Sequence, residues 1–87
     1  MDSQKFIEQC KLLVADYTNE NATQPDQKKI TYNDVYVVWS AKVLQNNKAL
    51  LSTPISDGMY YEVTFNGDKH ELYFDAYKKV TNKRIHL

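Results

Sequence analysis

The sequence predicts an α+β domain in which an N-terminal amphipathic helix packs on a four-stranded antiparallel sheet made of two hairpins. Three observations predict this class. Apolar residues recur at helical spacing near the N-terminus, residues 35–44 form an apolar run rich in β-branched and aromatic residues, and residues 59–77 alternate apolar and polar around a turn. With 87 residues the chain has the size of one domain, 1–87, with a modest core.

The helix is expected at about residues 3–18. Asp2 or Ser3 can accept hydrogen bonds from the amide groups at its start. One stripe of a 3.6-residue period is apolar and consists of Phe6, Cys10, Leu13, Val14 and Tyr17. Since Cys10 is the only cysteine, it has no internal disulfide partner, and we expect a small core residue in a reduced compartment. The polar residues 18–29 are predicted to be a connecting loop.

The strands are expected at about residues 34–45, 48–53, 59–65 and 69–77. Asn33 and Asp34 either lead into the first strand, cap a short turn, or start a second helix if residues 35–44 are not a strand. Residues 45–48 are predicted to form the first hairpin turn, because asparagine tolerates the left-handed conformation. Pro54 ends the second strand or confines it to an edge of the sheet.

Trp39 is predicted to anchor the core. A strict period of two directs alternate residues of the first strand toward the helix, namely Val35, Val37, Trp39, Ala41 and Val43. If Trp39 is buried there, Trp39→Ala should cost about 3–5 kcal/mol of stability.

The last hairpin has one apolar side. Two turns remain open, with Phe65 opposite either Asp68 or His70. Both give the same division of faces, so one side carries Met59, Tyr61, Val63, Phe65, Leu72, Phe74 and Ala76. Residues 78–87 form a basic tail that can add a short fifth strand or fray.

No enzyme signature is present. The two glycines lie in separate turns, and Cys10, His70 and His86 lack the spacing of a zinc site. A Cys10–His70 nucleophile pair would lack a third, orienting group. We therefore expect a non-enzymatic protein with no catalytic residue, metal or cofactor, and an enzyme is only the third alternative.

Charge bears on a nucleic-acid alternative. The chain has 11 basic and 11 acidic residues, and this zero net charge disfavours nucleic acid as the partner. The alternative is a weak single-strand binder that uses the basic tail, because cations beside stacking rings track such strands. Its residues would be Lys78, Lys79, Lys83 and Arg84.

Tyrosines on the polar side of the last hairpin suggest a protein partner instead. Tyr60, Tyr73 and Tyr77 offer large contact area at low entropic cost, although β-propensity alone also explains them. An exposed edge strand ending near Pro54 would permit a homodimer by sheet extension. No apolar run reaches the length of a membrane span.

Five segments within about residues 34–80 carry a resemblance to known proteins, namely VYVVWS (35–40), LQNNKALLST (44–53), DGMYYE (57–62), FNGDK (65–69) and DAYKK (75–79). In these segments the chain resembles a family of small proteins of unknown function encoded by bacteriophages and prophages of Gram-positive bacteria. The resemblance implies a phage accessory protein in the cytoplasm of a bacterial host and assigns no site residues. Our leading hypothesis is that the protein binds a host or phage protein, for example as an inhibitor of a defence or replication factor.

Overall fold

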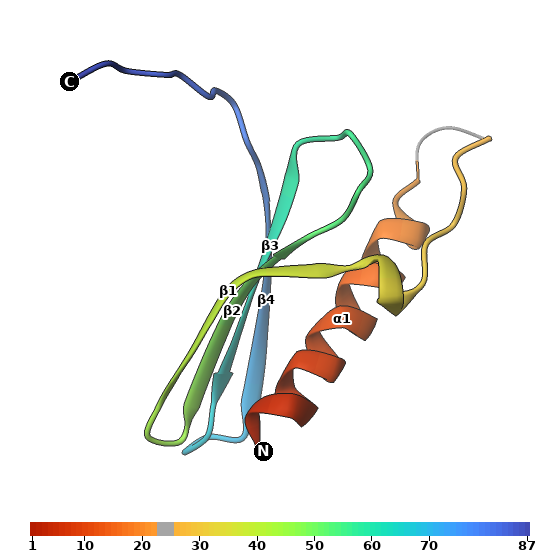
Figure 1. Ribbon diagram of the computed structural model, residues 1–87. Coiled ribbons are helices and arrows are strands. Elements are labelled where there is room, and N and C mark those ends of the chain that lie inside the picture. Colours follow the sequence, from red (N-terminus) through yellow and green to blue (C-terminus); the bar gives the residue numbers. More distant parts are fainter. Residues whose placement is uncertain (23–25) are drawn as a thin grey trace.

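The computed structural model describes residues 1–22 and 26–87 and confirms the predicted class. One α-helix packs on a four-stranded antiparallel sheet made of two hairpins (Figure 1). The elements in chain order are α1 (Ser3–Glu20), the 3-10 helix η1 (Tyr32–Asp34), β1 (Tyr36–Val43), β2 (Asn46–Ser52), β3 (Met59–Asn66) and β4 (Glu71–Lys78).

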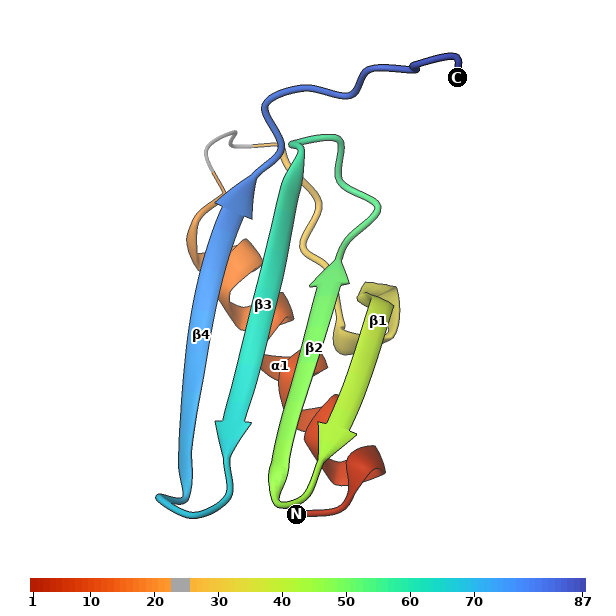
Figure 2. The ribbon, with the colours of Figure 1, turned by 90° about the vertical axis from the view of Figure 1, so that its left-hand side faces the viewer.

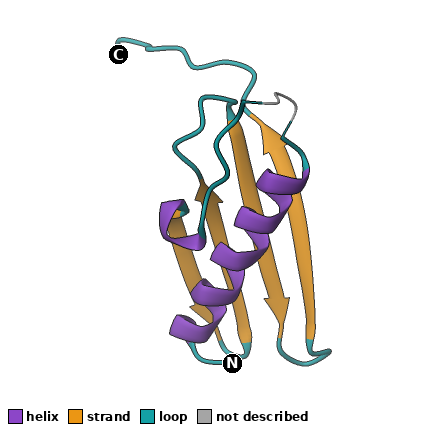
Figure 3. Cartoon of the chain, turned by 90° about the vertical axis from the view of Figure 1, so that its right-hand side faces the viewer, coloured by secondary structure: helices purple, strands orange, loops and turns teal. Residues whose placement is uncertain are grey.

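The molecule has two layers. The strands lie in the order β1-β2-β3-β4, so β1 and β4 are the edges. Helix α1 crosses one face of the sheet, where it contacts β2 and β3 (Figure 3). No element of the described chain covers the opposite face, which is seen directly in Figure 2. We call this uncovered side of the sheet the open face.

Helix α1 begins where predicted and ends two residues later. The Asp2 carboxylate accepts a hydrogen bond from the Lys5 amide at 2.8 Å and caps the first turn. At the other end, the Asn19 side chain holds the returning chain, because it both accepts from the Ile30 amide (2.9 Å) and donates to the Ile30 carbonyl (2.8 Å). Residues 23–25 of the predicted loop lie outside the described residues.

A short turn precedes the sheet, as one of the three interpretations of Asn33 and Asp34 predicts. In η1 the Asp34 carboxylate accepts a hydrogen bond from the Thr31 amide at 2.8 Å. Val35 follows and is buried. Strand β1 therefore begins at Tyr36 instead of residue 34.

The predicted faces of the first strand are wrong beyond Val37. Val37 pairs with Leu51, but Trp39 pairs with Leu50, so Val38 is an extra residue that forms a β-bulge. Since directly paired residues share a face, Trp39 lies on the open face with its partner Leu50. Ala41 and Val43, two and four residues further on, lie on this face as well.

The first hairpin turn is shorter than predicted. Leu44 and Gln45 connect β1 to β2, with Leu44 in the left-handed region at φ 57°. Residues 46 and 47, which were expected in the turn, belong to β2. Strand β2 lies between β1 and β3, so the prediction of an edge strand ending near Pro54 is wrong.

The faces of the second hairpin are confirmed, although neither predicted turn occurs. Phe65 pairs with Leu72, and residues 67–70 connect the strands. This pairing keeps the parity that both alternatives shared. Strand β4 ends at Lys78, and residues 79–87, which we call the tail, form no fifth strand.

The core lies between α1 and the middle of the sheet. Tyr61 is its largest fully buried side chain, and its ring lies 5.7 Å from Tyr17 and 5.8 Å from Phe74, centroid to centroid. Cys10 is fully buried, as predicted. The buried apolar residues are Phe6, Cys10, Val14, Ala15, Val35, Ala49, Leu51, Tyr61, Val63 and Phe65.

Asn47 is a buried polar residue whose side chain lacks hydrogen-bond partners. Its side chain is 2% exposed, and neither amide atom has a hydrogen-bond partner. It lines a cavity of about 230 Å³ under the start of α1, together with Phe6, Ser40 and Lys42. A buried amide without partners costs stability.

Candidate protein-binding face

The predicted tyrosines lie together on the open face. Tyr60 and Tyr77 are directly paired across β3 and β4, and Tyr73 pairs with Thr64 four residues along. Tyr73 is 47% exposed and Tyr77 is 52% exposed, while Tyr60 is half-buried. These rings are available to a partner, because α1 lies on the other side of the sheet (Figure 2).

Trp39 extends this aromatic surface to the far edge of the sheet. It is 44% exposed, and one row of paired residues joins it through Leu50 and Glu62 to Asp75. The prediction that Trp39 lies in the core is therefore wrong. No residue type marks the bulge at Val38, so the sequence carried no signal that could have found it.

Acidic side chains surround the tyrosines. Glu62 and Asp75 are directly paired, and Glu71 lies at the end of β4 on the same face. Glu62 forms an ion pair with Lys48 at 3.5 Å, whereas the described residues give Asp75 no ion pair. The Tyr73 hydroxyl donates a hydrogen bond to Glu71. This hydrogen bond raises the pKa of the Tyr73 phenol and keeps the donor protonated.

The four cations of the nucleic-acid alternative do not form one cluster with the tyrosines. Lys79 lies 5.6 Å from the centre of the Tyr60 ring, within the range of a cation–π contact. Lys83 and Arg84 lie in the exposed tail. Lys78 pairs with Met59 and lines a cavity beside the last turns of α1.

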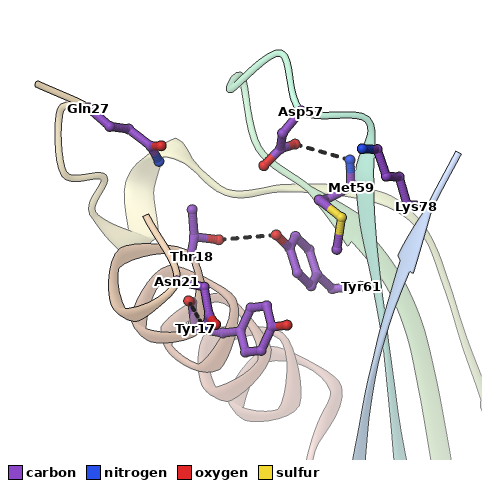
Figure 4. Close-up of a pocket in the computed structure, with 8 residues that line it drawn as sticks. All are labelled: Tyr17, Thr18, Asn21, Gln27, Asp57, Met59, Tyr61 and Lys78. Carbon is purple, nitrogen blue, oxygen red and sulfur yellow. Dashed lines mark hydrogen bonds between the residues drawn. The ribbon is translucent and has the colours of Figure 1, made fainter. Parts of the chain in front are cut away.

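The cavity that Lys78 lines is small, and hydrogen bonds between its own residues occupy part of its polar lining (Figure 4). Its volume is about 220 Å³, below the usual range for small-molecule sites. Several of its polar groups already pair, since Thr18 donates a hydrogen bond to the Tyr61 hydroxyl (3.4 Å) and the Met59 amide donates to the Asp57 carboxylate (3.0 Å).

Cys10 and His70, which were considered as a nucleophile pair, lie in different surroundings, one buried and one exposed. Burial raises the pKa of the Cys10 thiol to about 12, so the thiol stays protonated at neutral pH. His70 is exposed in the last hairpin turn, where its ring meets Phe65 edge-on. Within residues 1–22 and 26–87, no group of three or more His, Cys, Asp or Glu side chains could hold a metal ion.

The fold and this face define a two-layer α+β domain with one sheet face left to solvent and lined by aromatic and acidic residues. The chain belongs to a family of unknown function, DUF6275, whose model matches residues 7–87. Neither the curated proteins nor the solved structures contain a significant match. In the described part of the chain, no helix is long and apolar enough to cross a membrane.

Proposed function

We propose that this protein is a non-enzymatic binding module that recognises a host or phage protein through its open face. One observation carries the proposal: a single helix covers one side of the sheet and leaves Trp39, Tyr73 and Tyr77 about half exposed on the other. Exposed apolar patches of this kind mark interaction sites in soluble proteins.

The composition of the face supports a protein partner. Tyrosine and tryptophan are enriched among the residues that dominate binding energy at interfaces. Here they occupy a regular sheet, so little conformational freedom would be lost on binding. The carboxylates of Glu71 and Asp75 add a preference for a partner with basic groups.

The proposed setting follows from the sequence resemblance. It is a phage accessory protein that acts in the cytoplasm of a bacterial host, for example against a defence or replication factor. The unpaired, buried Cys10 agrees with a reduced compartment.

The experiment is affinity capture of the tagged full chain from infected cells, with two matched variants. Tyr73→Ala/Tyr77→Ala removes two exposed aromatics from the open face. Leu12→Ala/Tyr32→Ala removes two apolar side chains of similar exposure, 47% and 46%, from α1 and η1. We expect a partner that both the wild type and the second variant retain and the first variant loses. Equal retention by both variants, or no captured protein, would overturn the proposal.

Weak binding of single-stranded nucleic acid is the second candidate, favoured by the contact of Lys79 with the Tyr60 ring beside an exposed basic tail. The test is the fluorescence anisotropy of a labelled oligonucleotide at about 50 mM and about 200 mM salt. Binding should fall with salt, and Lys83→Gln/Arg84→Gln should weaken it. Salt-insensitive or absent binding would exclude this candidate.

A further inference from the structure

The two edges of the sheet are not alike. The bulge at Val38 interrupts β1, and bulges protect an edge from pairing with another chain. Strand β4 pairs with β3 without any register shift from Met59–Lys78 to Asn66–Glu71. It contains no proline, and every residue in it except Phe74 is exposed. Strand β4 is therefore a regular edge that is open to a further strand.

The backbone of β4 has groups free for such pairing. The Lys79 amide donates to the Gly58 carbonyl at 2.7 Å, so Lys79 directs its backbone toward β3. Hydrogen-bonding direction alternates along an antiparallel strand. The backbone amide and carbonyl groups at every second residue from 71 to 79 therefore point to β3. Four residues of β4 direct these groups outward, namely Leu72, Phe74, Ala76 and Lys78.

Charges along this edge are arranged symmetrically about Tyr77. Glu71 and Asp75 precede it by six and two residues, and Lys79 and Lys83 follow it by two and six. The contact of Lys79 with Tyr60 places Lys79 on the open face, as its position in step with Tyr77 requires. If the strand continues to residue 83, all four charged side chains line the same face.

We infer that two copies of this chain pair antiparallel along β4 and the first residues of the tail, about a two-fold axis at Tyr77. This register places Glu71 opposite Lys83 of the second copy and Asp75 opposite Lys79 of the second copy. Each copy repeats both pairs, as an isologous interface requires. The same register also brings the outward backbone groups of Ala76 opposite those of Lys78 of the second copy.

The pairing provides partners for groups that have none in the described part of the single chain. Asp75 gains an oppositely charged neighbour, and the tail, whose one backbone hydrogen bond in the described structure comes from Lys79, gains a strand to follow. On the helix side, Val80, now 93% exposed, comes opposite Phe74 of the second copy. The two sheets become one, with both helices on the same side. The inference does not depend on the proposed protein partner.

Cysteine cross-linking tests the register. In this arrangement residue 77 lies opposite itself in a pair without hydrogen bonds, with the Cα atoms about 4.5 Å apart, a separation that a disulfide can span. We expect Tyr77→Cys to form a covalent dimer under mild oxidation. Wild-type protein is the control, because its Cys10 is buried.

A second pair of variants checks the neighbouring positions. Tyr73→Cys and Thr81→Cys should each form little covalent dimer alone and should cross-link when mixed, since these residues oppose each other in the same register. No cross-link for Tyr77→Cys, or equally efficient cross-linking of Tyr73→Cys with itself, would overturn the inference.

Charge exchange tests the pairing without cysteines. Sedimentation equilibrium would compare Lys79→Glu/Lys83→Glu, Glu71→Lys/Asp75→Lys and their equal mixture. Each variant alone should dimerise about tenfold more weakly than the wild type, because every pair becomes repulsive. The mixture should recover wild-type association. Monomeric wild-type protein, or a mixture no stronger than its components, would contradict the inference. Circular dichroism would confirm that the variants fold.

Discussion

Gly67 lies so close to Gln45 that a methyl group added at Gly67 would come within 2.2 Å of the Gln45 carbonyl oxygen. The two residues belong to different hairpin turns, which meet at one end of the sheet. A hydrogen bond from the Gly67 amide to Asn46 Oδ1, 3.0 Å long, reinforces this contact. The first and second hairpins are thus fitted to each other through their turns as well as through the pairing of β2 with β3.

Gly67→Ala should therefore lower the free energy of unfolding by about 3 kcal/mol, because a backbone segment must move to relieve the overlap. The matched control is Gly58→Ala. Gly58 has φ 71°, and an added methyl group would meet no atom closer than the Lys79 oxygen at 3.6 Å, so only the left-handed conformation costs, about 1 kcal/mol. Urea denaturation measures both, and equal losses would contradict the close approach.

The exposure of Trp39 can be measured by fluorescence, since it is the only tryptophan. We expect acrylamide to quench the native fluorescence efficiently. Trp39→Ala should cost about 1 kcal/mol or less, whereas Phe6→Ala in the core should cost about 3–5 kcal/mol. A shielded tryptophan with a large loss on truncation would return Trp39 to the core and contradict the bulge.

Asn47→Leu should stabilise the protein by about 1 kcal/mol, because it removes a buried amide that has no partner. The neighbouring cavity of about 230 Å³ gives the larger side chain room. Asn46→Leu is the control at the adjacent position and should destabilise by about 1 kcal/mol, since Asn46 accepts the Gly67 hydrogen bond. Thermal unfolding of both variants would show the opposite signs, and a destabilised Asn47→Leu would reveal an amide that is satisfied.

Because of Cys10, the free energy of unfolding should decrease as the pH rises above 9.0. Burial raises the pKa of the folded thiol from 9.0 to about 12, so above pH 9.0 the unfolded state binds fewer protons than the folded state, and the free energy of unfolding decreases with pH. This contribution is complete below 9.0 and is lost progressively toward 12.

The measurement compares urea midpoints at about pH 8 and about pH 10.5 in the wild type and in Cys10→Ala. The variant should lose less stability over this interval. Burial also raises the pKa of Tyr61, so part of the decrease should remain in Cys10→Ala. An identical decrease in both proteins would mean that Cys10 is not desolvated.

The sequence was sufficient to predict which residues of the second hairpin lie on the core side and which lie on the open face, but it was insufficient for the first hairpin. Phe65 and Leu72 share a face in any register that keeps the parity of the two predicted turns, so the division between core and open face did not depend on finding the turn. The same parity placed Tyr60, Tyr73 and Tyr77 on the open face. Their role as a binding site stays a prediction.

The predicted faces of the first hairpin are wrong because the bulge at Val38 interrupts the period of two. Val38 looks like its neighbours, and nothing in a run of valines shows that one of them is unpaired. The turn failed for a related reason: Asn46 and Asn47 have the composition of a turn, yet Leu44 adopts the left-handed conformation. Pairing with β3 decides this, because Asn47 lies opposite Phe65, and local preference is overridden.

The bulge at Val38 also changes how this surface can evolve. Loss of the Val38 codon would bring Trp39 directly after Val37 and restore period two, so Trp39, Ala41 and Val43 would keep their places on the open face. Loss of a residue between Trp39 and Val43 would instead reverse the faces of the residues on one side of the deletion. Among relatives with this fold, a difference of one residue in strand length should therefore be compatible with the same surface when it falls at the bulge.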